Sequence, residues 1–349
     1  MIAAAQAVQR PGDARLLVID AGGAIAHVPR AEWTEQLRPG DVVVANDAAT
    51  LPASLHGTHL ASGAPIEVRL AGRASLAAED VSFSAVVFGA GDWRTRTEER
   101  PLPPPLALGE RLALGPLTAS VRGELGHPRL VALRFAGDAG AVWAGIARHG
   151  RPIQYAYLHE ALSLWDVWTP IAALPVAFEA PSAGFALDWR SLERLRRRGV
   201  GFATLTLAAG ISSTGDPALD ARLPLDEPYR LPAATAAAIR AAKARGGRIV
   251  AIGTTVVRAL EHARGVAGPG LADQRVAAGW RLRVVDAVLS GTHEPQESHY
   301  QLLRAFQDDA ALARASAELE AHGYRTHEFG DSVLIERSRG PQLPARSSR

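Results

Sequence analysis

Apolar runs divide the first part of the chain into predicted strands. Two runs, 15–19 and 41–46, predict strands joined by a short helix through Trp33 and Leu37. After them the runs become shorter and alternate with polar residues, and clusters of Gly and Pro separate them. The clearest of these shorter runs are 66–70, 81–87 and 130–135. This pattern predicts antiparallel β structure that closes into a barrel or a sandwich.

From residue 153 onward, segments with strand spacing alternate with segments with helical spacing, which is typical of an α/β layer. The expected strands are 201–207, 249–252, 282–289 and 333–335. The expected helices include 191–198 and 232–245. A third helix is expected to start at Thr254 or Thr255, and Asp308 or Asp309 is expected to cap a fourth. The predicted fold class is therefore α/β, with a mixed-sheet body and an inserted antiparallel β-barrel-like domain. The body is expected at 1–50 and 151–336, the insert at 51–150, and a disordered tail at 337–349.

Composition narrows the protein class and the compartment. Hydrophobic residues make up 47% of the 349 positions, which fits a globular chain. No apolar stretch approaches the roughly 20 residues that cross a bilayer, and the start of the chain lacks the features of a signal peptide. The absence of cysteine excludes disulfides, thiolate metal sites and cysteine nucleophiles. A cytoplasmic protein without a membrane partner is expected.

The charge pattern permits an RNA partner but does not indicate one. The formal net charge is only +2, and nucleic-acid-binding domains often carry more. The densest basic run lies at 190–198 and ends at Gly199. Cations in the last turn complement the helix dipole, and glycine commonly follows a helix end. A solvated helix end is therefore favoured over a phosphate-binding patch.

The segment 246–261 combines a buried strand, a glycine turn and the start of a helix. Gly253 turns the chain, and Thr254 or Thr255 stands at the expected N-cap. Unpaired backbone N–H groups and hydroxyls would then point at one spot, which suits an anionic or polar ligand. An ordinary capped turn is the alternative, and shape alone favours it.

Three further places carry polar or small residues that could contact a ligand. Asn46 and Asp47 follow a strand, where a carboxylate can bind ribose hydroxyls or stabilise its own turn. Residues 181–184 form a small-residue turn that would let a ligand approach the backbone. Asp286 lies in an apolar run and needs a partner, for which Arg258 and Arg283 are the candidates. A structural ion pair and a functional role both remain open for this aspartate.

His293 follows the strand expected at 282–289 and is the most chemically suggestive residue. The near-neutral pKa of an imidazole suits proton transfer, although an isolated loop histidine often has no such role. Pairing of His293 with His299, or of His322 with His327, would suggest a metal. Neither pair has the usual i, i+4 helical spacing, so no metal is expected.

These segments resemble, in order along the chain, the motifs of the S-adenosylmethionine:tRNA ribosyltransferase-isomerases of queuosine biosynthesis. The resemblance runs from about Arg15 to Ile335 and rests on the ordered set of blocks. The matching blocks are 37–47, Ala180-Pro181-Ser182-Ala183-Gly184, 246–261, 284–289, Ser290-Gly291-Thr292-His293-Glu294-Pro295, Gly323-Tyr324-Arg325 and 329–335.

The resemblance implies an enzyme that uses S-adenosylmethionine as a ribosyl donor, with tRNA as the acceptor. The family transfers and isomerises the ribosyl moiety onto a deazaguanine base in tRNA. By resemblance, His293, Asp286 and Asp47 are the catalytic candidates, with His293 as the group that transfers the proton. The substrate-binding candidates are Asn46, Ser182, Gly184, Gly253, Thr254, Thr255, Arg258, Tyr324, Gly330 and Asp331.

The sequence also departs from the family's motifs at polar positions. Ala48-Ala49 replaces a Thr-Arg pair, Ala208 stands where the family has a histidine, and 297–301 replaces a Ser-Thr-Leu-Leu-Met helix start. A divergent paralogue is therefore expected, and two alternatives stay open. One is an S-adenosylmethionine-dependent transferase or lyase that acts on a small molecule without RNA. The other is a non-catalytic nucleoside-binding paralogue.

Overall fold

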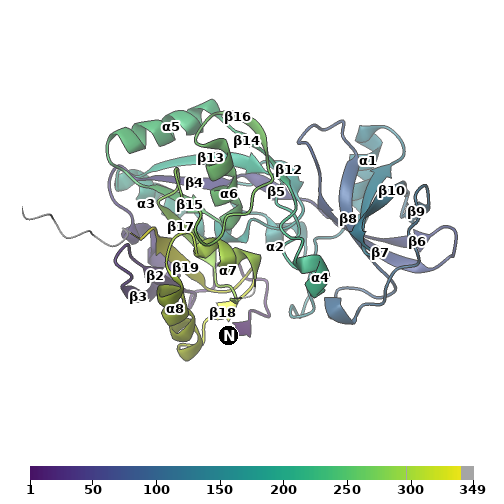
Figure 1. Ribbon diagram of the computed structural model, residues 1–349, viewed down its shortest axis with the longest axis horizontal. Helices are drawn as coiled ribbons and strands as arrows, with labels where there is room; N and C mark the ends of the chain where they lie inside the picture. Colours follow the sequence, from purple (N-terminus) through teal and green to yellow (C-terminus); the bar gives the residue numbers. More distant parts are fainter. Residues whose placement is uncertain (296, 339–349) are drawn as a thin grey trace, which may run out of the picture.

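The computed structural model describes residues 1–295 and 297–338. A nine-stranded sheet with its helices occupies the left of Figure 1, and a closed six-stranded barrel occupies the right. The predicted fold class, a mixed-sheet α/β body with an inserted antiparallel β barrel, is confirmed. In the described part of the chain, no helix is long and apolar enough to cross a membrane.

The central sheet has the strand order β16-β14-β13-β4-β15-β17-β19-β2-β3. In that order the strands are Gly268–Ala272, Glu227–Leu231, Gly201–Leu207, Val42–Asn46, Ile249–Ile252, Ala287–Gly291, Ser332–Glu336, Arg15–Ile19 and Ile25–Pro29. Strands β13, β4, β15 and β17 run parallel, and β19 is antiparallel to β17. Four parallel strands therefore end at the same edge of the sheet, and β19 begins there.

Helices cover both faces of this sheet because its strands alternate their apolar side chains. Val43 and Ala45 pack in a core with residues of α3, whereas Val42 and Val44 pack with residues of α5 and α6. The helices are α1 (Ala139–His149), α2 (Leu164–Val167), α3 (Trp189–Arg197), α4 (Pro217–Asp220), α5 (Ala233–Ala244), α6 (Thr254–Ala263), α7 (Ser298–Leu303) and α8 (Asp309–Ala321). Three 3₁₀ helices add η1 (Arg30–Gln36), η2 (Thr97–Glu99) and η3 (Ser182–Ala186). As predicted, Asp308 caps α8 by accepting from the Ala311 backbone N–H.

The barrel closes in the order β10-β11-β8-β7-β6-β9. These strands are Leu117–His127, Leu130–Phe135, Ser82–Phe88, Pro65–Gly72, Ser54–His59 and Arg111–Leu114. Between body and barrel lies a two-stranded parallel sheet of β5 (Ala48–Thr50) and β12 (Leu174–Ala177), and β1 (Ile2–Ala3) pairs with β18 (Arg325–Thr326). One continuous apolar core extends from the barrel into the body. The division into two domains at residues 50 and 150 stays a prediction.

Local structure differs from the sequence predictions at three places. The helix through Trp33 is 3₁₀ and Leu37 is its C-cap. The N-cap of α6 is Gly253 instead of a threonine, and its φ of +96° favours glycine. The strand predicted at 282–289 begins at Ala287, because the backbone N–H groups of residues 283–285 donate to the Glu261 carboxylate instead of to a neighbouring strand.

The basic run at 190–198 and the start of the predicted tail also have clear structural roles. Helix α3 ends before Gly199, whose φ is +68°, and Arg196 and Arg197 pair with Glu193 on the same helix. The basic run is therefore a helix end, as predicted. The first two residues of the predicted tail are bound to the body, because the backbone N–H groups of Arg337 and Ser338 donate to its carbonyl oxygens. Residues 339–349 lie outside the described residues.

Candidate active site

Several of the residues singled out from sequence lie at one edge of the central sheet. Asp47 follows β4, Gly253 follows β15 and His293 follows β17, and all three strands end at this edge. Asp331 precedes the antiparallel strand β19 and lies at the same edge. We call it the carboxyl edge. Ligands of open α/β sheets bind outside the carboxyl ends of the strands, so this edge is the place to look for chemistry.

Asn46 and Asp47 hold neighbouring strands together. The Asn46 side-chain amide donates to the Leu207 carbonyl, and its oxygen accepts from the backbone N–H groups of Leu207 and Ala48. These three bonds are 2.9 to 3.1 Å long. The Asp47 carboxylate accepts from the Thr206 hydroxyl at 2.7 Å. Both polar atoms of the Asn46 side chain thus bind the backbone, whereas Asp47 keeps one carboxylate oxygen for other contacts.

The small-residue turn and the glycine turn lie against each other. A Cβ placed on Gly253 would come within 3.6 Å of the Ala183 side chain, next to Ser182. Gly184 is also tightly packed, because a Cβ there would come within 2.9 Å of Thr169. Thr254 is buried and Thr255 is partly exposed at the start of α6. The structure therefore brings together the two segments that were proposed separately.

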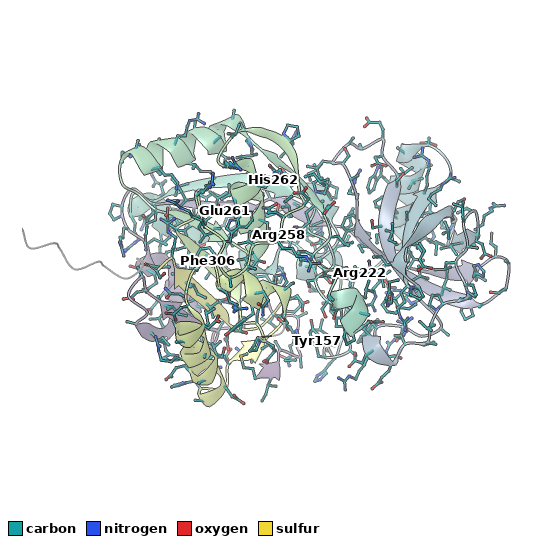
Figure 2. All side chains as sticks on the ribbon, in the orientation of Figure 1. Tyr157, Arg222, Arg258, Glu261, His262 and Phe306 are labelled. Atoms are coloured by element: carbon teal, nitrogen blue, oxygen red, sulfur yellow. The ribbon has the colours of Figure 1, made fainter. Side chains whose placement is uncertain are left out.

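Arg258 and Asp286 do not pair, which corrects the sequence expectation. Arg258 is buried on α6 within the body (Figure 2), where it pairs with Glu227 and donates to the Ala272 carbonyl. The Asp286 carboxylate accepts from the Ile249 backbone N–H at 3.0 Å and from Arg337 at 2.8 Å. Neither predicted arginine is its partner.

Asp286 also lies at the wrong end of its strand for a shared site. It precedes β17, whereas His293 follows it. At about 3.3 Å per residue, a five-residue strand separates the two side chains by more than about 15 Å. The structure therefore does not bring the catalytic candidates Asp286 and His293 together.

His293 is the centre of a hydrogen-bonded chain of side chains. Its Nε2 atom lies 3.0 Å from the hydroxyl of Ser290, and its Nδ1 atom lies 3.1 Å from the Glu297 carboxylate. Burial raises the pKa of the Glu297 carboxyl, but its contacts with His293 and the nearby histidines outweigh burial and lower it. An ionised Glu297 accepts the Nδ1–H, which leaves the Nε2 lone pair as the basic site of His293.

His299 lies beside this chain and is held neutral. Its ring centroid is 4.6 Å from that of His293. Burial, together with the nearby charge of His293, lowers the pKa of His299 to about 3. The segment at 297–301, which departs from the family's motif, therefore supplies two polar neighbours of His293.

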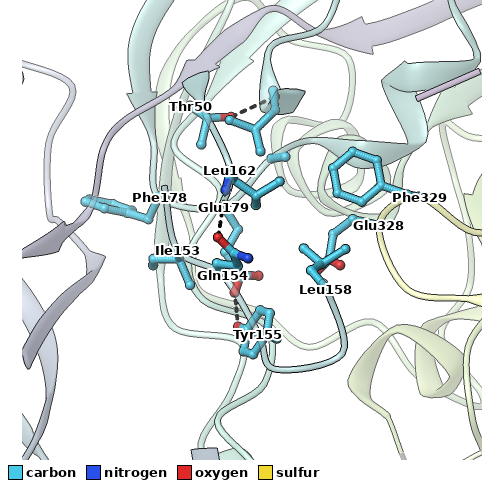
Figure 3. A pocket seen from close by; sticks show the side chains of 12 residues that line it. Thr50, Ile153, Gln154, Tyr155, Leu158, Leu162, Phe178, Glu179, Glu328 and Phe329 are labelled. Atoms are coloured by element: carbon cyan, nitrogen blue, oxygen red, sulfur yellow. Dashed lines mark hydrogen bonds between the residues drawn. The ribbon is translucent and has the colours of Figure 1, made fainter. Parts of the chain in front are cut away.

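A small pocket lies beside Glu328 and Phe329, which precede β19 at the carboxyl edge (Figure 3). Glu179 and Tyr155 approach each other in it, and Glu328 and Phe329 line another side. The remaining lining residues are Thr50, Ile153, Gln154, Leu158, Leu162, Val167, Phe178 and Ala180. Arg69 on barrel strand β7 lies 5.6 Å from the Tyr155 ring centroid, so the barrel contacts one of the residues that line this pocket.

Glu179 is the most perturbed carboxyl group of this pocket. Its carboxylate accepts from the hydroxyl of Tyr155 and from the hydroxyl and backbone N–H of Ser212, the last two at 2.6 and 3.0 Å. Burial, with the negative charge of nearby Glu328, raises the pKa of Glu179 to about 7. A carboxyl group with this pKa can accept or donate a proton near neutral pH.

Glu328 connects the pocket to the last motif block. It accepts from the Tyr157 hydroxyl, and the Tyr157 ring stacks on His327 with centroids 4.2 Å apart. In Figure 2, Tyr157 lies on the side of the body that faces the barrel. Tyr155 stacks on Tyr157 in turn, with centroids 5.9 Å apart. An aromatic stack therefore connects the Glu179 pocket with His327.

The last three candidates from sequence, Tyr324, Gly330 and Asp331, stabilise the fold near the carboxyl edge and do not line the pocket. The buried Asp331 carboxylate accepts from Arg15 and from the Arg325 backbone N–H. Gly330 packs directly on the backbone, since a Cβ there would come within 2.4 Å of the Arg325 carbonyl. The Tyr324 hydroxyl lies 2.9 Å from His27 on β3, away from His293. Burial raises the pKa of Tyr324 to about 12.

Comparison with known proteins gives one consistent result. A family model described as "Queuosine biosynthesis protein" matches residues 1–335. The chain belongs to this family. A relative from Sorangium cellulosum, named S-adenosylmethionine:tRNA ribosyltransferase-isomerase, is 34% identical over 99% of this chain and 96% of its own. A relative of the same name from Anaeromyxobacter dehalogenans is 35% identical over 95% of each chain.

A solved structure shows the same fold. The crystal structure of S-adenosylmethionine tRNA ribosyltransferase from Thermotoga maritima matches with a TM-score of 0.51 and 24% identity, over 95% of this chain and 96% of that one. The family resemblance inferred from the ordered motifs is therefore confirmed, and it includes the barrel. The roles of the individual residues stay predictions.

The sequence reasoning missed Tyr155, Glu179, Glu297 and Glu328. Adjacency to a motif was the available signal for two of them, because Glu179 directly precedes residues 180–184 and Glu328 directly precedes residues 329–335. Glu297 stood inside a segment that was noted only as a departure from the family. Tyr155 gave no signal, since it lies in a loop that only the folded chain brings against Glu179.

Proposed function

We propose that this protein is an S-adenosylmethionine:tRNA ribosyltransferase-isomerase of queuosine biosynthesis. It would transfer and isomerise the ribosyl moiety of S-adenosylmethionine onto a deazaguanine base in tRNA. The observation that carries this proposal is the near-full-length match to relatives of that name, which spans body and barrel together. A pocket in the body beside the carboxyl edge, one lining residue of which the barrel contacts, supports it.

The proposed chemistry needs a base in a sheltered site. The sulfonium of S-adenosylmethionine acidifies the adjacent 5′ carbon, a base removes the proton, and the resulting carbanion-like carbon expels adenine. Methionine is the second leaving group and is released when the ribosyl moiety is transferred to the tRNA base. In this proposal His293 accepts the proton at Nε2, and the ionised Glu297 holds the imidazole in the required tautomer. The hydroxyl of Ser290 occupies Nε2 until a substrate carbon replaces it. A step of this kind contributes about 10²–10⁴-fold to the rate.

Three further groups, one in the pocket and two at the carboxyl edge, have distinct proposed roles. Glu179, with a pKa of about 7, is suited to return or share a proton in the pocket. The turn from Gly253 to Thr255 is proposed to hold a polar end of the donor, and Ser182 lies beside it. Asp47 is proposed to contact ribose hydroxyls with its remaining carboxylate oxygen. Asn46, Arg258, Asp286 and Asp331 are assigned to the scaffold. The reaction itself requires no metal, and a tRNA acceptor implies the cytoplasm.

The test is the release of adenine from S-adenosylmethionine by the purified chain. The proposal predicts adenine only when tRNA that carries the deazaguanine precursor is present, with ribosyl incorporation into that tRNA. Adenine without RNA would instead indicate a transferase or lyase that acts on a small molecule. Donor binding without adenine under either condition would indicate a non-catalytic nucleoside-binding paralogue. The departures at residues 48–49 and Ala208 make both alternatives worth measuring.

A further inference from the structure

Three side chains at the carboxyl edge place potential metal ligands together. One nitrogen from each of His293 and His299 and one carboxylate oxygen of Glu297 all lie within 4.8 Å of one another. His293 comes from the loop after β17, whereas Glu297 and His299 flank the first residue of α7. All three residues are partly buried. Sequence spacing argued against a metal at His293 and His299, because the cluster spans a loop and a helix start instead of one helical face.

The donor set matches a known class of metal. Two imidazoles and one carboxylate are the protein ligands of many catalytic Zn²⁺ sites, and they leave a further position open for water or substrate. The same set with open positions also suits other divalent first-row transition metals. The hard cations Ca²⁺ and Mg²⁺ prefer sites made wholly of oxygen ligands.

The surroundings of His293 supply the outer contact that such sites use. A histidine that binds metal through one ring nitrogen usually donates its other N–H to a neighbouring oxygen, which fixes the ring. The Ser290 hydroxyl lies 3.0 Å from Nε2 and is buried on β17. Nδ1, on the other side of the ring, already faces Glu297. The imidazole is therefore aimed at the point between the three ligands before any ion arrives.

We infer that His293, Glu297 and His299 form a binding site for a divalent transition-metal ion of the Zn²⁺ class. The ion takes Nδ1 of His293 together with the Glu297 carboxylate and one nitrogen of His299. The proton of His293 then resides on Nε2 and is donated to Ser290. Metal ligation and acceptance of a proton at Nε2 are thus alternative states of one imidazole. This last consequence rests on the proposed function, whereas the metal site itself does not.

A second cluster in the chain provides a matched control. His27, Glu318 and His322 also place their ligand atoms within 4.8 Å of one another. Both of these histidines are exposed, and both already have other partners. His27 contacts the Tyr324 hydroxyl, and His322 contacts a backbone carbonyl of α8. Exposed ligands that must leave existing partners bind an ion more weakly, so this cluster is expected to contribute little.

The test is metal content of the full chain, without tRNA or donor. Chelator-treated protein is dialysed against Zn²⁺ in the low micromolar range, and bound metal is measured. We expect one equivalent in the native chain, its loss in Glu297→Gln and His299→Leu, and its retention in His322→Gln. No bound Zn²⁺ in the native chain, or loss of the ion in His322→Gln but not in His299→Leu, would overturn the inference.

A second measurement uses only the native chain, so that it remains informative if the variants do not fold. Co²⁺ added to the native chain should give visible absorption bands of a low-coordinate nitrogen and oxygen site, and one equivalent of Zn²⁺ should abolish them. Proton NMR should show the histidine signals of His293 and His299 shifted by Co²⁺, with those of His27 and His322 unchanged. The featureless weak spectrum of hexaaquo Co²⁺ would contradict the site. These results do not depend on ribosyl transfer, so failure of the metal site and failure of the proposed function are separable.

Discussion

The two edges of the central sheet carry polar side chains that are partnered in different ways. At the amino edge, before the parallel strands, Asp41 accepts three hydrogen bonds from Arg248, which also pairs with Glu336. Asp286 pairs with Arg337 at the same edge. At the carboxyl edge, no Lys or Arg of the described residues forms an ion pair with Glu179 or Glu328.

The difference shows which polar residues are available for chemistry. Burial lowers the pKa of Arg248, but Asp41 and Glu336 outweigh it and raise the pKa, so that the network stays ionised. Glu179 has only hydroxyl and backbone partners, and its pKa rises to about 7. A group compensated by an opposite charge keeps its protonation state, whereas a buried group without one can change it near neutral pH. The carboxyl edge is not uniform, since Asp331 and Glu227 there do have arginine partners.

The largest predicted effect comes from breaking the amino-edge network. Asp41→Ala removes the carboxylate that Arg248 contacts and leaves a largely buried guanidinium without its main partner. Breaking a buried pair in this way costs about 3–5 kcal/mol of unfolding free energy. Chemical denaturation should show this loss, with turnover per folded molecule unchanged. Arg196→Ala, which breaks an exposed pair on α3, is the control and should leave the denaturation midpoint in place. Equal midpoints for both variants would show that the network does not stabilise the sheet.

Removing the imidazole at the carboxyl edge should affect rate more than stability. His293→Ala is predicted to lower turnover by about 10²-fold or more, with donor affinity little changed, because a proton-transfer group acts in the transition state. His293→Gln should be nearly as slow, since an amide does not titrate. Single-turnover adenine release and donor titration measure the two quantities. Near-normal turnover by folded His293→Ala protein would remove this residue from the mechanism.

The pKa of Glu179 predicts a stability that depends on pH. The group has a pKa of 4.5 in the unfolded chain and about 7 in the folded one, so the folded state binds the proton more tightly. The contribution of Glu179 to the free energy of unfolding is fully present below pH 4.5 and is lost as the pH rises through 7. Glu179→Gln mimics the neutral form and should exceed the native chain by less than about 1 kcal/mol at pH 5 but by about 3 kcal/mol at pH 8.

Thermal melts at both pH values measure this difference. Glu193→Gln, at an exposed position on α3 whose carboxylate pairs with arginines, is the control and should show no gain at the higher pH. A constant difference between native and Glu179→Gln protein across this range would mean that Glu179 is already ionised at pH 5.

The smallest predicted effect is that of Asp286→Asn. The amide can still accept from the Ile249 backbone N–H and loses only the half-exposed charge pair with Arg337. Partly exposed pairs contribute about 0–1 kcal/mol, so the melting temperature should fall by only a few degrees. Melts of Asp286→Asn and Arg337→Gln should agree, since each breaks the same pair. A large loss in one alone would show a further role for that residue.

The sequence predicted most of the elements because their periodicity is local. Strand β13 and strand β15 match the predicted runs 201–207 and 249–252, and Asp308 caps α8 as expected. The start of β17 was missed because Glu261, from another helix, binds the preceding backbone. The pairing of Asp286 with Arg337 was missed for the same reason, since the partner comes from a distant segment. The Tyr155–Glu179 contact likewise depends on long-range packing that no local pattern encodes.

The most direct test compares one residue from each edge in the same assay. Adenine release from S-adenosylmethionine, with precursor-bearing tRNA, is measured for His293→Gln and Asp286→Asn and normalised to folded protein. Both substitutions replace a titratable side chain by an amide at an end of β17. We predict a loss of about 10²-fold or more for His293→Gln and turnover close to native for Asp286→Asn. Equal losses in the two variants, or the larger loss in Asp286→Asn, would contradict the assignment of chemistry to the carboxyl edge.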